Sequence, residues 1–118
     1  MCKGVKLLEL TKDAKYLLIS IYKVYKDKRK DNLSKFESKY FGHAEELHSN
    51  YFNNWHMEDF LDACRELSRN GYLKCVFASN TIASINLTDD AIVYNENRYK
   101  NNYRQLVQDI GDLKKLIF

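Results

Sequence analysis

Apolar residues recur at helical spacing in two segments of the first fifty residues. Thr11 is a good N-cap for a helix over about 12–29, and Asp13 lies in the first turn, where the helix dipole favours a negative charge. Ser34-Lys35-Phe36-Glu37 has the form of a capping box and opens a short helix that Gly42 can stop. A further turn or two from His43 completes this second helical region, which we expect over about 35–49.

The clearest amphipathic pattern covers residues 57–69 and predicts a third helix. Asn70-Gly71 ends it, because glycine readily adopts the left-handed conformation of a helix C-terminus. One face of this helix is apolar and is expected to be buried: Met57, Phe60, Leu61, Cys64 and Leu67.

After Gly71 the period of the pattern falls to about two residues, as in a strand. Leu73, Cys75 and Phe77 alternate with their neighbours, and Ser79-Asn80 can form a turn. Alternation then resumes in a second strand. The pattern predicts a hairpin over about 73–87, and the alternating residues of its second strand are Ala83, Ile85 and Leu87.

Thr88-Asp89-Asp90 caps a final predicted helix over 89–118. From Tyr99 onward its apolar residues are separated by gaps of four and three, the spacing of a heptad seam. Asn101-Asn102 and Gly111 are weak points at which this helix can kink or break. The seam consists of Tyr103, Leu106, Ile110, Leu113 and Ile117.

Composition narrows the class of protein. With 118 residues, 45% of them hydrophobic, the chain can form one domain with a substantial core, and the absence of proline fits a helical fold. No apolar run approaches the roughly 18 residues of a membrane-spanning helix, and Met1-Cys2-Lys3-Gly4 lacks the long apolar stretch of a signal peptide. We therefore expect a cytoplasmic protein whose three cysteines are reduced.

The net charge of +3 is unevenly distributed. Residues 1–42 hold 11 Lys and Arg against 5 Asp and Glu, whereas residues 43–73 hold 2 against 6. Such a distribution bears on the partners of a protein rather than on its fold.

The order of the predicted elements is that of a winged helix-turn-helix domain. Glu66-Leu67-Ser68-Arg69-Asn70-Gly71-Tyr72-Leu73, two strands and then Leu87-Thr88-Asp89-Asp90-Ala91 carry this resemblance. The tail from Leu87 to Lys114-Lys115 is similar to small winged-helix proteins of Gram-positive phages and other mobile elements, of the YjcQ type. The resemblance implies a mainly α fold with a β-hairpin. It also implies a winged-helix core over 1–90, the C-terminal helix 89–118, and a nucleic-acid-binding accessory or regulatory role.

In this family pattern the helix 57–69 would enter the major groove of duplex DNA. Its outer face departs from that role, because carboxylates outnumber cations there and oppose a phosphate backbone. An alternative function follows: a protein-interaction module, such as a replication adaptor or an inhibitor of a nucleic-acid enzyme. Its partner interface would consist of Glu58, Asp59, Asp62 and Glu66, with Trp55 beside them either as an exposed patch or as a lid on the core.

A basic cluster lies at the end of the first helix and on the second. Tyr22 and Tyr25 lie between its lysines, so ammonium groups could hold phosphates while the rings stack unpaired bases. The alternative is that these cations complement the helix dipole and the two tyrosines belong to the core. The nucleic-acid contacts predicted for duplex or single-stranded DNA are Lys23, Lys26, Lys28, Arg29, Lys30, Lys35, Lys39, Arg65 and Arg69. A second, weaker basic and polar stretch follows: Asn97, Arg98, Lys100, Asn101, Asn102 and Arg104.

No pattern points to catalysis or to a bound cofactor. His43, His48 and His56 lack the spacing of zinc ligands, and Cys64 and Cys75 fall on inward positions. The glycines are scattered and form no phosphate-binding loop. We therefore expect a non-enzymatic protein without metal or cofactor.

The C-terminal helix predicts the oligomeric state. A winged-helix core does not need a further helix of about thirty residues, so the heptad seam is expected to pack on the same seam of a second chain. We therefore predict a homodimer. The alternative is a helix that folds back on its own core.

Overall fold

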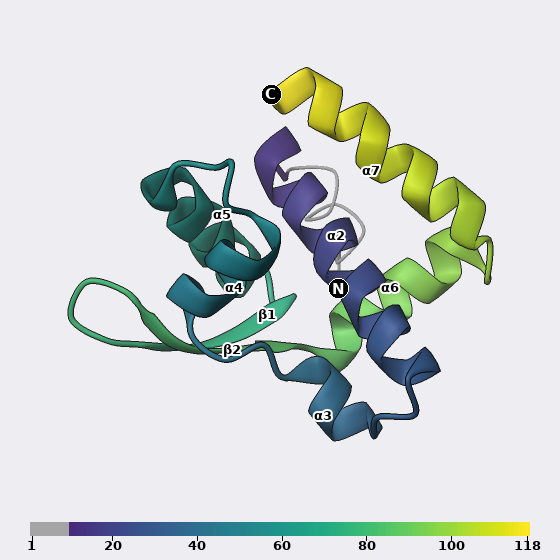
Figure 1. Ribbon diagram of the computed structural model, residues 1–118, viewed down its shortest axis with the longest axis horizontal. Coiled ribbons are helices and arrows are strands. Elements are labelled where there is room, and N and C mark those ends of the chain that lie inside the picture. The colour runs from purple at the N-terminus through teal and green to yellow at the C-terminus, as the bar shows by residue number, and fades with distance from the viewer. Residues whose placement is uncertain (1–9) are drawn as a thin grey trace.

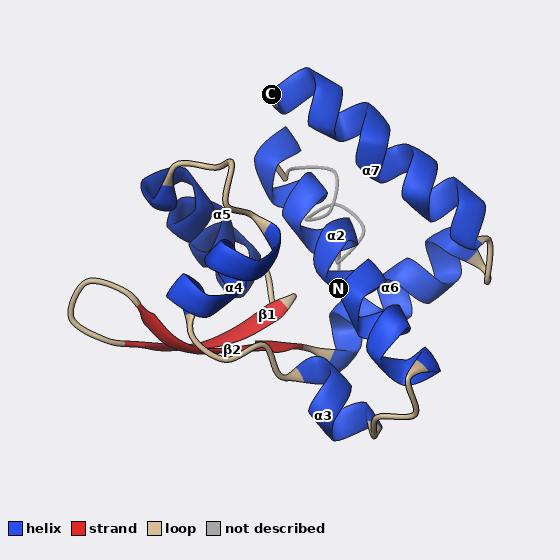
Figure 2. Cartoon of the chain, viewed as in Figure 1, coloured by secondary structure: helices blue, strands red, loops and turns tan. Residues whose placement is uncertain are grey.

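Helices dominate the computed structural model, which describes residues 10–118 (Figure 1). The predicted class, mainly helical with a β-hairpin, is confirmed (Figure 2). The first nine residues of the predicted 1–90 core lie outside the described residues. In chain order the elements are α2 (Lys12–Lys30), α3 (Lys35–Lys39), α4 (Ala44–Tyr51), α5 (Met57–Arg69), β1 (Leu73–Phe77), β2 (Ile82–Leu87), α6 (Asp89–Tyr99) and α7 (Tyr103–Ile117).

Helix α2 runs between the other helices and is buried along most of its length (Figure 1). The predicted cap is confirmed, since the Thr11 hydroxyl accepts a hydrogen bond from the Ala14 amide at 3.2 Å. Thr11 is itself held by α5: its amide and its hydroxyl each donate to the Glu66 carboxylate at 2.8 Å. The start of α2 is thereby fixed to α5.

The predicted helical region 35–49 is wrong as one unit, because an extended segment divides it into α3 and α4. The capping box of α3 is present, with Ser34 and Glu37 bonded to each other's amides. Tyr40 then forms a bridge with Asn86 of β2, and the backbone of the next two residues bonds to Ile85. Gly42, at φ +71°, turns the chain into α4. The helix does not continue through residues 40–42 because their backbone is paired with β2, a strand distant in the sequence.

The hairpin forms as predicted between β1 and β2, with Leu73 opposite Leu87 and Cys75 opposite Ile85. Its register shifts between Val76 and Phe77. The strict alternation expected from the sequence is therefore wrong near the turn: Ile82 is buried, whereas Phe77 is exposed.

The expected single helix over 89–118 is also wrong, because it breaks at the first weak point into α6 and α7. Lys100 and Asn101 have φ of +46° and +68°, and the Asn102 side chain caps α7. Gly111 lies inside α7 without breaking it. Helix α7 returns alongside α2 (Figure 1). No helix within residues 10–118 has the length and apolarity needed to cross a membrane.

This return places the heptad seam against the chain's own core. Leu106 is 1% exposed, and the other four seam residues pack against the same core. The Tyr103 hydroxyl donates to the Asp27 carboxylate of α2 at 3.1 Å. The seam thus packs as in the fold-back alternative, and the homodimer stays a prediction.

Trp55 also belongs to the core, as a lid rather than an exposed patch. Its ring stacks on Tyr16 at 5.8 Å and lies edge-on to Phe60 at 6.2 Å. Since the indole is buried, Trp55 is removed from the predicted partner interface.

Candidate nucleic-acid interface

The two tyrosines of the predicted basic cluster are core residues. Tyr22 and Tyr25 are buried and stack on each other with ring centroids 6.0 Å apart. Burial raises the pKa of Tyr22 to about 12. Neither ring is available to stack on a base, so this part of the predicted interface is wrong.

Two lysines of the cluster have structural contacts. The Lys23 ammonium pairs with Asp27 at 2.9 Å, and this hydrogen bond is the largest cause that raises its pKa. The Lys28 ammonium donates to the Tyr40 carbonyl at 2.7 Å and lies 4.1 Å above the Phe41 ring. Burial lowers the pKa of Lys28. Lys28 thus holds α2 to the segment after α3, whereas the Lys23 ion pair lies within α2.

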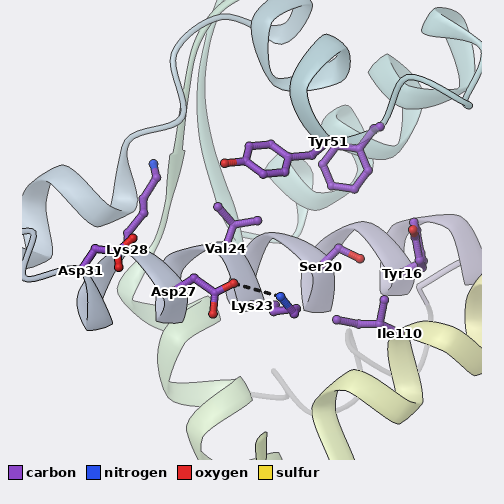
Figure 3. A pocket seen from close by; sticks show the side chains of 10 residues that line it. Tyr16, Ser20, Lys23, Val24, Asp27, Lys28, Asp31, Tyr51 and Ile110 are labelled. Atoms are coloured by element: carbon purple, nitrogen blue, oxygen red, sulfur yellow. Dashed lines mark hydrogen bonds and ion pairs between the residues drawn. The ribbon is translucent and has the colours of Figure 1, made fainter. Parts of the chain in front are cut away.

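A cavity of about 290 Å³ lies between α2 and the end of α4, with Ile110 of α7 among its lining residues (Figure 3). Val24 and Phe52 give it an apolar lining, and the Lys23–Asp27 ion pair lies along α2 (Figure 3). Since Lys23 and Lys28 are its two lining cations and both are engaged, the cavity offers no free cation to a phosphate.

The remaining cations of α2 lie at its C-terminal end. Arg29 donates to the Leu33 carbonyl at 3.2 Å and so stabilises the end of the helix. Lys30 lies 4.2 Å from the centroid of the Tyr103 ring. Within residues 10–118, neither Lys26 nor Lys30 forms an ion pair. These two ammonium groups can accept an anionic partner.

The end of α2 and the turn between α6 and α7 meet on one side of the molecule (Figure 1). There Lys26, Lys30, Asn101 and Asn102 line a cavity of about 210 Å³ whose other lining residues are Tyr22, Tyr99, Tyr103 and Leu106. Lys100 and Arg104 flank this turn in sequence, are exposed and form no ion pair within the described part of the chain. We name Lys26, Lys30, Lys100 and Arg104 the basic edge.

A network of polar side chains fixes the turn that presents the basic edge. The Tyr99 hydroxyl donates to Asp109 at 2.8 Å, and Arg98 lies 3.7 Å from the same carboxylate. Burial raises the pKa of Tyr99 to about 12. Because α6 and α7 are tied together here, the backbone of the turn is fixed before any ligand binds. The sequence did not reveal this site because its residues come from two stretches, the end of α2 and residues 97–104, that are far apart in the chain.

Lys35 and Lys39 bind the start of α6. Their ammonium groups lie 3.6 and 2.9 Å from Asp89, respectively. The hydrogen bond from Lys39 is the largest cause that lowers the pKa of Asp89. These contacts fix α3 against α6.

The Asp89 contacts predict a pH dependence. Because the pKa of Asp89 is lower in the folded state, its contribution to stability is present above its ordinary pKa of 3.8 and is lost as pH falls through the lowered value. Asp89→Asn should therefore lower the urea midpoint at pH 7 and lower it less at about pH 3, below the ordinary pKa of 3.8. Asp112→Asn, at an exposed position of α7, is the control. A loss of stability equal at both pH values would contradict this origin.

The outer face of α5 is acidic, as predicted, but two of its carboxylates already have partners within the fold. Glu66 holds Thr11, and Arg65 pairs with Asp62 at 2.9 Å. Glu58, Asp59 and Arg69 are exposed. Near the tip of the hairpin, the Thr81 hydroxyl donates to Glu45 at 2.7 Å. The surface around α5 therefore presents mostly carboxylates.

The histidines and cysteines do not converge. Within residues 10–118, no three His, Cys, Asp or Glu side chains are arranged to hold a metal ion. His48 bonds to the Trp55 carbonyl at 2.7 Å. Burial raises the pKa of the Cys64 and Cys75 thiols, which disfavours their reactive thiolate forms.

Comparison with known proteins finds no match to the chain among family models, curated proteins or solved structures.

Proposed function

We propose that this chain is a winged helix-turn-helix protein that binds nucleic acid without enzymatic activity. Three features support the fold: α2, α4 and α5 precede the hairpin, α4 and α5 are joined by a short turn, and Tyr40 pairs with β2 before α4 begins. The short helix α3 and the α6–α7 pair are additions to that plan. The resemblance of the tail to winged-helix proteins of phages and mobile elements supports an accessory or regulatory role.

The basic edge is the contact surface in this proposal. The observation that carries it is the meeting of Lys26 and Lys30 with Asn101 and Asn102, from segments about 75 residues apart, at a turn held by Tyr99 and Asp109. The exposed Lys100 and Arg104 flank this turn in sequence, and none of the four cations forms an ion pair within residues 10–118. Ammonium and guanidinium groups bind phosphates and release counterions, and the Asn101 and Asn102 amides can bond to phosphate or base edges. Helix α5 is a poor alternative, since its exposed carboxylates would face the phosphate backbone.

Removing two cations of the basic edge should weaken DNA binding. Lys26→Ala/Arg104→Ala is expected to reduce affinity about tenfold at low salt and to flatten the salt slope by about two units, one for each phosphate that the variant no longer neutralises. The measurement is a titration of labelled duplex and single-stranded DNA at two salt concentrations.

Two matched variants complete the titration. Lys114→Ala/Lys115→Ala removes the same charge from the far end of α7 and should change affinity less than twofold. Glu58→Gln/Asp59→Asn should leave affinity equal or higher. A wild-type protein that binds neither form of DNA at low salt would overturn the proposed function.

A second candidate function is a protein-interaction module that uses α5. The exposed Glu58 and Asp59 carboxylates, with Asp62 one turn further, would suit a basic protein surface. In this alternative Glu58→Gln/Asp59→Asn would abolish binding of the protein partner, and Lys26→Ala/Arg104→Ala would not.

A further inference from the structure

The hairpin bears a groove on the face opposite the helical core. Helices α4 and α5 lie on one side of the hairpin, and α3 stands at its base (Figure 1). The groove has a volume of about 630 Å³ and is bounded by α3, the Tyr40 bridge and both strands. Its lining residues are Phe36, Lys39, Tyr40, Lys74, Val76, Asn86, Leu87 and Thr88.

Two aromatic rings in this groove are open to solvent. Phe36 is 81% exposed and Tyr40 is 48% exposed, and Val76 beside them is also exposed. A cluster of exposed apolar side chains is unusual on a protein without a partner at that surface. The capping box of α3 and the ion pairs of Lys35 and Lys39 with Asp89 hold Phe36 in this position. The fold therefore maintains an exposed ring at the groove.

The rim of the groove is basic. Lys39 and Lys74 line it. Lys39 shares the Asp89 carboxylate with Lys35. Glu37 is turned back to the Ser34 amide in the capping box. Lys74 forms no ion pair within residues 10–118. The groove thus combines accessible rings with the Lys74 ammonium group, which has no ion-pair partner among the described residues.

We propose that this groove binds single-stranded nucleic acid, an inference that rests on the proposed function and assigns it a preferred form of ligand. Unpaired bases would stack on Phe36 and Tyr40, the Lys74 ammonium group would pair with a phosphate, and the Asn86 amide would bond to a base edge. Paired bases of a duplex present no free face to these rings. A protein partner is disfavoured because lysine is depleted in protein interfaces.

The groove is tested by truncating its rings one at a time. Phe36→Ala and Tyr40→Ala should each weaken binding of a labelled oligothymidylate about tenfold while changing duplex affinity less than twofold. Tyr51→Ala is the matched control, since Tyr51 is 53% exposed on α4 and lies outside the groove. Circular dichroism should show unchanged helix content in all three variants.

A second measurement reports directly on the groove. Phe36→Trp adds an exposed indole in the groove, a second one besides the buried Trp55 of the core, and the emission of the new indole should be quenched by oligothymidylate but not by duplex.

The outcomes separate the inference from the proposed function. Unchanged oligothymidylate affinity in Phe36→Ala and Tyr40→Ala overturns the groove site, whereas the proposed function stands if Lys26→Ala/Arg104→Ala still weakens binding. A Phe36→Trp indole that responds to an acidic apolar peptide but to no oligonucleotide overturns the inference in favour of a protein-docking groove. Wild-type protein that binds no DNA at all overturns both.

Discussion

Replacing Leu106 by alanine is expected to lower the free energy of unfolding by about 3 kcal/mol, whereas Val107→Ala should change it by less than about 0.5 kcal/mol. Leu106 is fully buried in the core, and Val107, the next residue of α7, is 42% exposed. Truncation of a buried leucine removes apolar contacts and leaves a cavity, but truncation of an exposed valine removes little buried surface. Urea unfolding followed by circular dichroism measures both changes.

The Leu106→Ala variant also tests whether the apolar seam of α7 packs on its own chain or on a second chain. If α7 covers its own core, Leu106→Ala lowers stability at every protein concentration. If the predicted homodimer used this seam, the variant would instead dissociate into a folded monomer, and wild-type stability would rise with concentration. Light scattering on wild type and variant, combined with unfolding at two concentrations, distinguishes these cases.

The parts of the fold that sequence predicted correctly depend on contacts between near neighbours. Thr11, Ser34 and Thr88 cap their helices by bonds to amides three residues away, so the local sequence contains the whole signal. Gly71 ends α5 at φ +84° for the same local reason. The end of α6 was foreseen only as a weak point, because left-handed residues at 100 and 101 give no strong signal without glycine.

The parts that sequence missed depend on distant partners. The break between α3 and α4 requires the Tyr40 bridge to Asn86, which no local pattern reveals. Similarly, Lys28 and Lys39 were predicted as nucleic-acid contacts from their place in a basic cluster. In the structure Lys28 bonds to the Tyr40 carbonyl, and Lys39 bonds to Asp89. A basic cluster in sequence is therefore not yet a basic surface. In this chain the surface arises where α2 meets the α6–α7 turn.

The exposed ring of Phe36 illustrates the same limit. The capping box predicts the helix that contains Phe36 but not the side to which its ring points. The ion pairs of Lys35 and Lys39 with Asp89 fix α3 against α6, and the Phe36 ring is exposed. Apolar character alone does not separate a folding role from a binding role.

Truncation of Phe60 should have the largest effect on stability, because it removes the centre of an aromatic cluster. Its ring is fully buried and lies 5.5 Å from Phe52, 6.2 Å from Trp55 and 5.4 Å from His48. Phe60→Ala is expected to cost about 4 kcal/mol, a large share of the roughly 5–15 kcal/mol by which a domain is stable.

Phe36→Ala is the matched control for Phe60→Ala, since it deletes the same side chain from an exposed site and should change stability by less than about 0.5 kcal/mol. Urea unfolding followed by circular dichroism compares the two variants, because this signal does not depend on the surroundings of Trp55. If Phe60→Ala proved no more destabilising than Phe36→Ala, the aromatic cluster would not support the α4–α5 turn. The expected result would show that Phe60 stabilises the fold. It would also show that the fold does not need Phe36, so that a loss of binding in Phe36→Ala can be attributed to the groove.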